Sequence, residues 1–166
     1  MSFRFFPDFC PETAQRETWG ITLQQAQHGL RAGVYSFLES YCDDPGCDCR
    51  RVWLTVTWQP LNAVILHTSG PLATIGYGWE PRTFYRKWSP GDPDAGDLAG
   101  ARLEPCQPQG PQAEEVLALT TAMILSPPAH QHRIRDHYAA VRQVVDGKRP
   151  QRGTGWHGQR NRKRPW

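Results

Sequence analysis

The stretch that decides the fold is VYSFLESYCDDPGCDCRRVWLTVTW, residues 34–58, where two runs of β-prone residues flank three closely spaced cysteines. Residues 34–41 are rich in aromatic and branched side chains, which is typical of a strand. Residues 50–58 alternate strictly from Val52 to Trp58, and this period of two is the clearest strand signal in the chain. The intervening Asp-Asp-Pro-Gly has the composition of a tight turn. The sequence therefore predicts two strands joined by a turn that carries cysteines.

The three cysteines, Cys42, Cys47 and Cys49, indicate a metal site. Soft thiolates on a tight turn can converge on one thiophilic ion, and zinc binds such sulfurs at about 2.3 Å in a tetrahedral array. The spacing of Cys47 and Cys49 is shorter than in a standard zinc finger. Arg50 and Arg51 follow directly, and we expect them to lower the thiol pKa values. A structural zinc site is the preferred interpretation. Free thiols or a disulfide, and a redox, iron–sulfur or open catalytic site, are the alternatives.

Three cysteines leave one coordination position to be filled. Cys10 and Cys106 are the first candidates, followed by His28. His67 is a poor candidate, because a simple hairpin would pair it with Leu54, about 16 Å from the last cysteine at the rise of a strand. Water is the remaining candidate, and an open position of this kind would favour catalysis.

The rest of the chain predicts an α+β domain over residues 1–147, a small antiparallel β-meander with a zinc knuckle at one end and about four helices packed on it. A capping box at Thr22–Gln25 predicts a helix that continues to Gly33. Further strands are expected at 63–67 and 72–77. Apolar spacing and helix-start signals predict helices at 79–88, 111–125 and 130–146, and the Pro- and Gly-rich segment 89–110 is predicted to be a loop.

The last 19 residues differ in charge from the rest. They contain seven basic residues and no acidic one, which leaves 12 basic and 16 acidic residues in residues 1–147, a net charge of −4. We expect a flexible basic tail that contacts nucleic acid, because Lys and Arg neutralise phosphates while Trp156 and Trp166 can stack on unpaired bases. The basic residues are Lys148, Arg149, Arg152, Arg160, Arg162, Lys163 and Arg164.

No apolar run approaches the roughly 20 residues that cross a bilayer, and the N-terminal apolar stretch is too short for a signal peptide. We therefore expect a cytoplasmic protein with no membrane partner. There the thiols stay reduced and clustered cysteines more often bind metal than form disulfides.

Two other groups of residues favour structural interpretations. His130, His132 and His137 are expected on a solvated helix face, because no carboxylate or cysteine spacing completes a metal site with them. Tyr77, Trp79, Tyr85 and Trp88 are expected to pack in the core and at its rim, with an aromatic binding groove as the alternative.

The segment Tyr41-Cys42-x4-Cys47-Asp48-Cys49-Arg50-Arg51-Val52 resembles the signature of a family of uncharacterised prokaryotic proteins. Members share a later element similar to Tyr77-Gly78-Trp79 and a segment similar to residues 84–88, so the resemblance covers roughly residues 33–145. It implies a metal site at the three cysteines and brings no established activity. Some members end in a SEC-C-type metal motif, which this basic C-terminus lacks.

Together these features predict a non-catalytic, zinc-stabilised binding module that contacts nucleic acid or a nucleoprotein partner, largely through the basic tail. Two alternatives stay open. One is a metal-dependent enzyme, such as a hydrolase, with an open zinc position. The other is a protein-interaction adaptor that does not bind nucleic acid.

Overall fold

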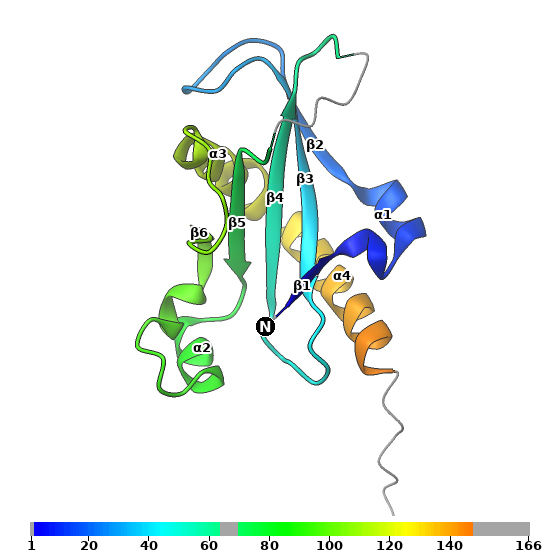
Figure 1. Cartoon of the computed structure of the whole chain (residues 1–166), viewed down its shortest axis with the longest axis vertical. Coiled ribbons are helices and arrows are strands. Elements are labelled where there is room, and N and C mark those ends of the chain that lie inside the picture. Colours follow the sequence, from blue (N-terminus) through cyan, green and yellow to red (C-terminus); the bar gives the residue numbers. More distant parts are fainter. Residues whose placement is uncertain (1, 64–69, 148–166) are drawn as a thin grey trace, which may run out of the picture.

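The computed structural model describes residues 2–63 and 70–147, which form an α+β fold (Figure 1). Its antiparallel sheet contains β1 (Phe3–Phe5), β2 (Trp19–Leu23), β3 (Gly33–Cys42), β4 (Arg51–Gln59), β5 (Ala73–Gly78) and β6 (Gly100–Leu103). The strand order is β1-β3-β4-β5-β6, and β2 also pairs with β3. The α+β prediction is confirmed.

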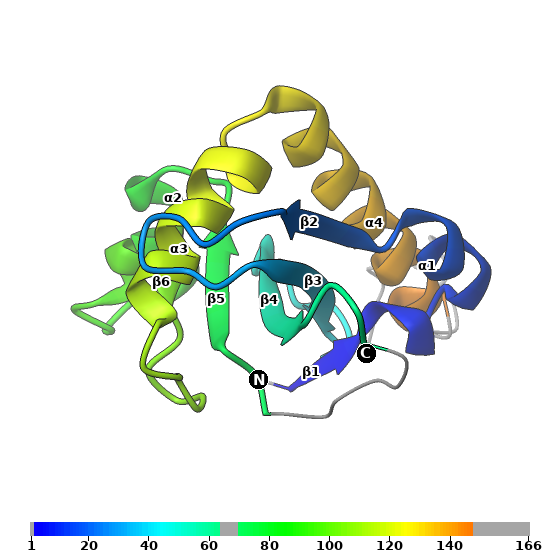
Figure 2. The same cartoon turned by 90° about the horizontal axis from the view of Figure 1, so that it is seen from above.

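Helices α3 and α4 lie on one face of the sheet, as the view along its strands shows (Figure 2). The α-helices are α1 (Pro11–Glu17), α2 (Arg82–Trp88), α3 (Ala113–Thr120) and α4 (Pro128–Asp146). Two short 3₁₀ turns, η1 (Phe6–Asp8) and η2 (Ala95–Leu98), and a π-helical turn, η3 (Thr121–Leu125), complete the described elements. None of the helices in the described ranges is long and apolar enough to span a membrane.

The two strands predicted around the cysteines form the centre of the sheet. They pair antiparallel, with Phe37 opposite Val56. Because side chains alternate along a strand, one face of this pair collects apolar residues for the core. Those on the face that α4 covers are almost completely buried: Tyr35, Phe37, Tyr41, Val52, Leu54 and Val56. The period-two signal therefore identified β4, and aromatic and branched content identified β3.

The helix predicted from Thr22 to Gly33 is wrong. Residues 19–23 form β2, which pairs with β3 from Trp19 opposite Phe37 to Leu23 opposite Gly33. The chain then turns through positive φ angles at His28 and Gly29. Non-local pairing with β3 overrides the local capping-box pattern, because that pairing buries Trp19 and Leu23 in the core.

Other segments differ from the prediction in smaller ways. The predicted loop 89–110 contains the edge strand β6 and η2. The sequence pattern did not predict β1 or α1. The predicted strand at 63–67 lies largely outside the described residues. In the sheet, β4 lies between β3 and β5. The predicted boundaries of the helices near residues 82, 113 and 128 agree with α2, α3 and α4 within a few residues.

On the sheet face opposite the helices, a buried ion pair joins β4 to the end of β6. The Arg51 guanidinium contacts the Glu104 carboxylate, and each side chain is 5% exposed. The carboxylate lies over Gly76, where an added Cβ would come within 2.0 Å of Glu104 Oε1. Glycine at this position is therefore required by close approach, with no need for unusual backbone angles.

Candidate metal centre

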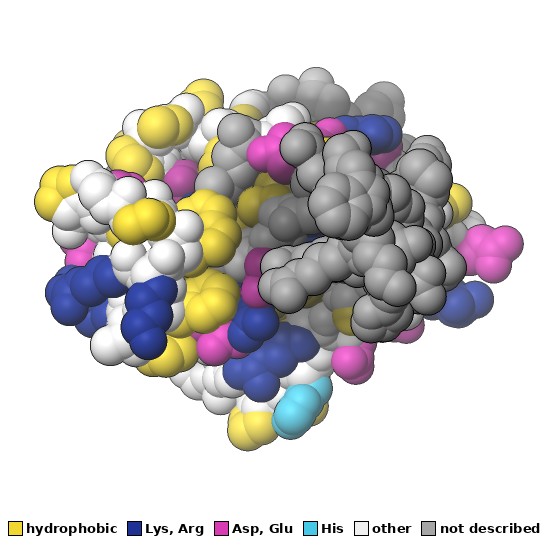
Figure 3. Space-filling view, turned by 90° about the horizontal axis from the view of Figure 1, so that it is seen from below, with side chains coloured by type: hydrophobic (Ala, Val, Ile, Leu, Met, Phe, Trp, Pro, Cys, Tyr) yellow, Lys and Arg dark blue, Asp and Glu magenta, His cyan; other side chains and the backbone are white. Residues whose placement is uncertain are grey.

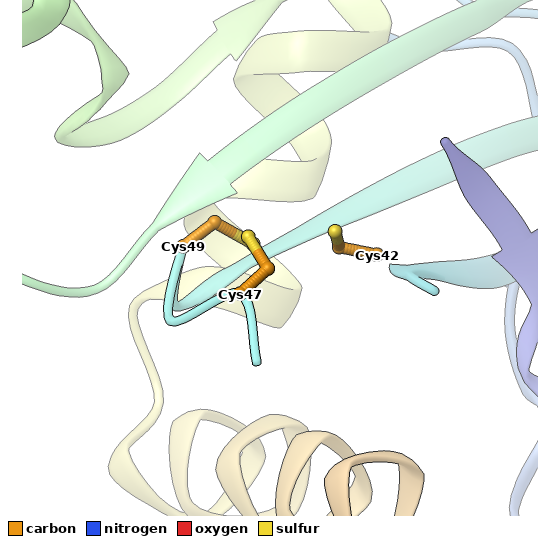
Figure 4. Close-up of side chains that lie close together, drawn as sticks. All are labelled: Cys42, Cys47 and Cys49. Atoms are coloured by element: carbon orange, nitrogen blue, oxygen red, sulfur yellow. The ribbon is translucent and has the colours of Figure 1, made fainter. Parts of the chain in front are cut away.

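The three cysteines lie together at the turn between β3 and β4 (Figure 4). Cys42 ends β3, while Cys47 and Cys49 lie on the loop that leads to β4. Their sulfur atoms all lie within 4.8 Å of one another, and no disulfide joins them. Among the described residues, they are the one group of three or more His, Cys, Asp or Glu side chains placed closely enough to hold a metal ion.

The local sequence explains why the loop brings these sulfurs together. Gly46 adopts a φ of 72° and Arg50 a φ of 47°, so the chain reverses between the cysteines and again before β4. The Cys47 amide donates a hydrogen bond to the Asp44 carbonyl at 3.2 Å, which closes the turn. Glycine accepts the left-handed conformation without cost, whereas Arg50 is held in it by its surroundings.

Helix α4 holds the loop from one side. The Arg142 guanidinium donates hydrogen bonds to the carbonyl oxygens of Asp44 and Cys47, both at 3.0 Å, and to that of Cys42. One turn further along the helix, Asp146 accepts a hydrogen bond from the Gly46 amide at 2.7 Å. Residues four apart lie on one helix face, so this face of α4 is built to bind the cysteine loop.

The pKa values of the three thiols indicate how readily the group can accept a cation. A hydrogen bond from Cys49 lowers the pKa of Cys42 to about 6, although burial opposes this shift. The pKa of Cys49 is raised, first because its thiol donates to Cys42 and then by burial, and burial also raises the pKa of Cys47. One thiolate therefore forms readily, while the other two thiols need a positive charge among them before they ionise.

Zinc fits this donor set. At about 2.3 Å from each sulfur in a tetrahedral array, the sulfurs would be about 3.8 Å apart. The present spread of up to 4.8 Å thus needs only a small contraction. Cys42 and Cys49 are fully buried and Cys47 is partly buried, so a bound ion would be shielded from solvent on most sides.

The fourth position is not filled by the residues that the sequence suggested. Cys10 caps the N-terminus of α1, Cys106 is exposed after β6, and His28 lies between β2 and β3. None of them joins the cysteine group. His67 lies outside the described residues. Within residues 2–63 and 70–147, the site thus offers three sulfurs and no fourth His, Cys, Asp or Glu side chain.

The two arginines that follow the cysteines have other partners. Arg51 forms the buried ion pair with Glu104, and Arg50 bonds Asp48 at 2.9 Å and Glu80 at 3.0 Å. Arg51 acts on the thiols through its backbone: the hydrogen bond to Cys42 and burial raise the pKa of Cys49, and a hydrogen bond from the Arg51 backbone amide lowers it by less. The basic residues from Lys148 to Arg164 lie outside the described residues, and their role stays a prediction.

The expectation of a solvated histidine face is wrong for His137, which is 4% exposed. Its Nδ1 lies 2.7 Å from Glu39 Oε2 and its Nε2 lies 3.0 Å from Glu17 Oε2. The available signal was that His137 shares the apolar face of α4 with Ile134 and Val141. A polar residue at such a position needs a buried partner.

The aromatic residues after β5 pack as expected. Tyr85 is fully buried, and its hydroxyl donates to the Arg50 carbonyl at 2.9 Å. Trp79 meets Tyr138 edge to face with ring centroids 5.2 Å apart, and Trp88 is partly buried against the core. These contacts link α2 and α4 to the end of the sheet that carries the cysteines.

Comparisons with protein-family models, with curated proteins and with solved structures found no match to this chain. The resemblance to a prokaryotic family therefore stays an expectation that depends on the motif residues alone.

Proposed function

We propose that this protein is a non-catalytic, zinc-stabilised binding module that contacts nucleic acid, free or within a nucleoprotein, through the segment from Lys148 to Trp166. The observation that carries the metal part is the convergence of Cys42, Cys47 and Cys49 within 4.8 Å. The loop around them has its carbonyl groups bound by Arg142, so the donors are positioned before any ion arrives.

Charge supports the nucleic-acid part. The segment 148–166 carries seven basic residues and no acidic one, whereas residues 1–147 have a net charge of −4. At the end of the molecule where the cysteine loop lies, basic, acidic and hydrophobic side chains are mixed on the part drawn in colour (Figure 3). The coloured part of this view thus shows no uniformly basic surface, which makes the segment the better candidate for phosphate contacts.

The cysteine loop contacts the last turn of α4, and the basic segment follows that turn in the chain. Lys148 follows Asp146 by two residues, and the Asp146 carboxylate holds Gly46 of the cysteine loop. Zinc that rigidifies this loop would also fix the last turn of α4, from which the basic segment starts. In this proposal the metal serves stability and positioning, and the chemistry of binding belongs to the segment.

The alternative of a zinc enzyme is favoured by one observation, the absence of a fourth ligand among the described side chains. Three thiolates, however, donate much charge to zinc and weaken its effect on a bound water. Cobalt substitution separates the two cases. If added azide changes the visible spectrum of the cobalt protein, the fourth position exchanges and catalysis becomes the better proposal; an unchanged spectrum supports a closed structural site.

The test of the main proposal measures metal and nucleic-acid binding on the same protein. The purified chain should contain one zinc per molecule. Its affinity for a single-stranded oligonucleotide should fall with salt, and replacing Arg160, Arg162, Lys163 and Arg164 by Gln should reduce the log–log slope by about 3, at about 0.7 for each phosphate that is no longer neutralised. Replacing Arg82 and Arg86 of α2 by Gln is the matched control and should leave the slope unchanged. An unchanged slope in the tail variant would refute the assignment.

A further inference from the structure

A cavity of about 290 Å³ lies between the N-terminal segment and β3, away from the cysteine loop. Its walls come from β1, η1 and α1 on one side and from β3 and α4 on the other. Most of the wall is apolar, formed by Phe5, Phe6, Pro7, Ala14, Phe37 and Leu38. The volume is at the lower end of the range for small-molecule pockets, about 300–1,000 Å³.

The cavity has one polar end, built around His137. The ring is held at Nδ1 by Glu39 and at Nε2 by Glu17. The Tyr41 hydroxyl donates to Glu39 Oε2 at 2.6 Å, and the Phe6 ring stacks on the imidazole with centroids 4.2 Å apart. These contacts fix Glu39 and His137 in place, whereas Glu17 projects from the last turn of α1 with a side chain that is 37% exposed.

The charge of the cavity is negative. Among the described residues that line it, three carry carboxylates (Asp8, Glu17 and Glu39), one is a histidine, and none is Lys or Arg. Asp8 is only loosely balanced, with Arg4 at 3.7 Å and both side chains about half exposed. Even with His137 protonated, the lining carries a net charge of −2.

Both carboxylates beside His137 retain binding capacity. Each uses its Oε2 atom for the imidazole, and within residues 2–63 and 70–147 no donor makes a hydrogen bond to Oε1 of Glu17 or Glu39. An ionised carboxylate accepts several hydrogen bonds, so these oxygens are available to a ligand. Arg133 interacts electrostatically with Glu39 and Glu17, but its guanidinium stacks on Trp19 at 3.4 Å and is not part of the lining.

We propose that this cavity binds a small organic cation, a primary ammonium group on an aromatic or branched aliphatic body. The ammonium group donates to Glu17, with Glu39 adding negative charge behind it, and the apolar body packs against Phe6, Phe37 and Leu38. This site uses none of the cysteine ligands and none of the basic segment, so it is independent of the zinc proposal.

A ligand of this size binds weakly, so the assay must detect millimolar affinities. Phenethylamine has nine heavy atoms, and a Kd of about 0.1–1 mM is expected for a fragment of that kind. Two probes of the same shape isolate the charge: 2-phenylethanol is neutral and phenylacetate is anionic. Binding is measured by amide chemical-shift changes in the full-length, zinc-loaded chain.

Phenethylamine should shift amides of β3 and α1, and 2-phenylethanol should bind at least about tenfold more weakly. Glu17→Gln should weaken phenethylamine binding about fivefold, whereas Glu12→Gln on the exposed side of the same helix should have no effect. Unfolding curves of both variants check that the fold is retained. The proposal is overturned if phenethylamine produces no shift at about 10 mM, if the neutral or anionic probe binds equally well, or if Glu17→Gln has no effect on a folded protein.

Discussion

Replacing His137 by Ala should destabilise the protein strongly, because it removes the imidazole that forms a hydrogen bond to the buried Glu39 carboxylate. The Glu39 side chain is 7% exposed, and its distance from His137 Nδ1 is 2.7 Å. Removing one partner of a buried ion pair costs about 3–5 kcal/mol. Tyr41 still donates to the remaining carboxylate, so we expect the lower end of this range, about 3 kcal/mol.

Replacing Glu17, the other carboxylate beside His137, should lower the free energy of unfolding much less. Glu17 is 37% exposed, and an ion pair with that access to water contributes about 1 kcal/mol or less. Glu17→Gln should therefore cost less than a third of His137→Ala. His132 lies on the exposed side of the same helix, and His132→Ala should leave the free energy of unfolding nearly unchanged.

The pH dependence has a defined sign. Burial lowers the pKa of His137, but the hydrogen bonds and charges of Glu39 and Glu17 outweigh it, so the pKa in the folded protein is raised above 6.5. A raised folded pKa means that the charged pair stabilises the protein fully below pH 6.5 and loses this contribution as pH rises through the folded pKa. The difference between wild type and His137→Ala should accordingly shrink with increasing pH.

Urea unfolding of the wild type and the three variants, at acidic and at alkaline pH, measures these differences. At about 2–4 °C per kcal/mol, the His137→Ala variant should also melt about 6–12 °C below the wild type at pH 6. The reasoning is refuted if His137→Ala costs less than about 1 kcal/mol, or if Glu17→Gln costs as much as His137→Ala.

Three further predictions concern the cysteine loop and the sheet. Cys49→Ser should lower bound zinc well below one per chain by mass spectrometry, whereas Cys10→Ser, which lies outside the cysteine group, should retain it; equal loss in both would refute the ligand assignment. Arg142→Ala should cost about 2 kcal/mol in urea unfolding and weaken zinc binding about tenfold in a chelator competition, because it removes the hydrogen bonds to three carbonyl groups of the loop. Gly76→Ala should cost about 3 kcal/mol by disrupting the buried ion pair above it, whereas Gly70→Ala, with nothing within 4 Å, should be near neutral; similar effects in both would contradict the close approach.

The sequence was informative where local pattern and final packing agree. The alternation from Val52 to Trp58 predicted β4 because the same side chains that alternate also fill the core. The spacing of the cysteines predicted their convergence, since a tight turn leaves three sulfurs little room to separate. In both cases the decisive contacts lie within about 25 residues of one another in the chain.

The failures came from contacts between distant segments. β2 carries a pattern that also satisfies a capping box, and only its pairing with β3 decides between strand and helix. β6 lies at the sheet edge and is four residues long, which is too short for an alternation of apolar and polar residues to be recognised. Whether a described fourth side chain joins the three sulfurs is a question of three-dimensional distance, which no spacing along the chain could answer.

The buried pair of Glu39 and His137 could have been anticipated from the positions of the two residues in the apolar repeats of β3 and α4. Glu39 falls in step with Tyr35, Phe37 and Tyr41 on β3, so it occupies a core position, and His137 does the same on α4. Each residue would be unfavourable there without a partner of opposite character. A polar residue at a core position of a strand and another at a core position of a helix are therefore expected to pair. That pairing in turn predicts that α4 packs on β3.

This pairing bears on how the proposed metal site and the rest of the molecule depend on each other. α4 is held to β3 in its middle by His137 and at its end by Arg142 and Asp146, which bind the cysteine loop. His137 and Asp146 are nine residues apart, about 13 Å along the helix. Loss of metal would therefore loosen the end of α4 that leads into the basic segment, while the buried pair keeps the remainder of the helix on the sheet. Under the proposed function, zinc would therefore affect the presentation of the segment as well as stability, because two of the three proposed ligands, Cys42 and Cys49, belong to the buried core.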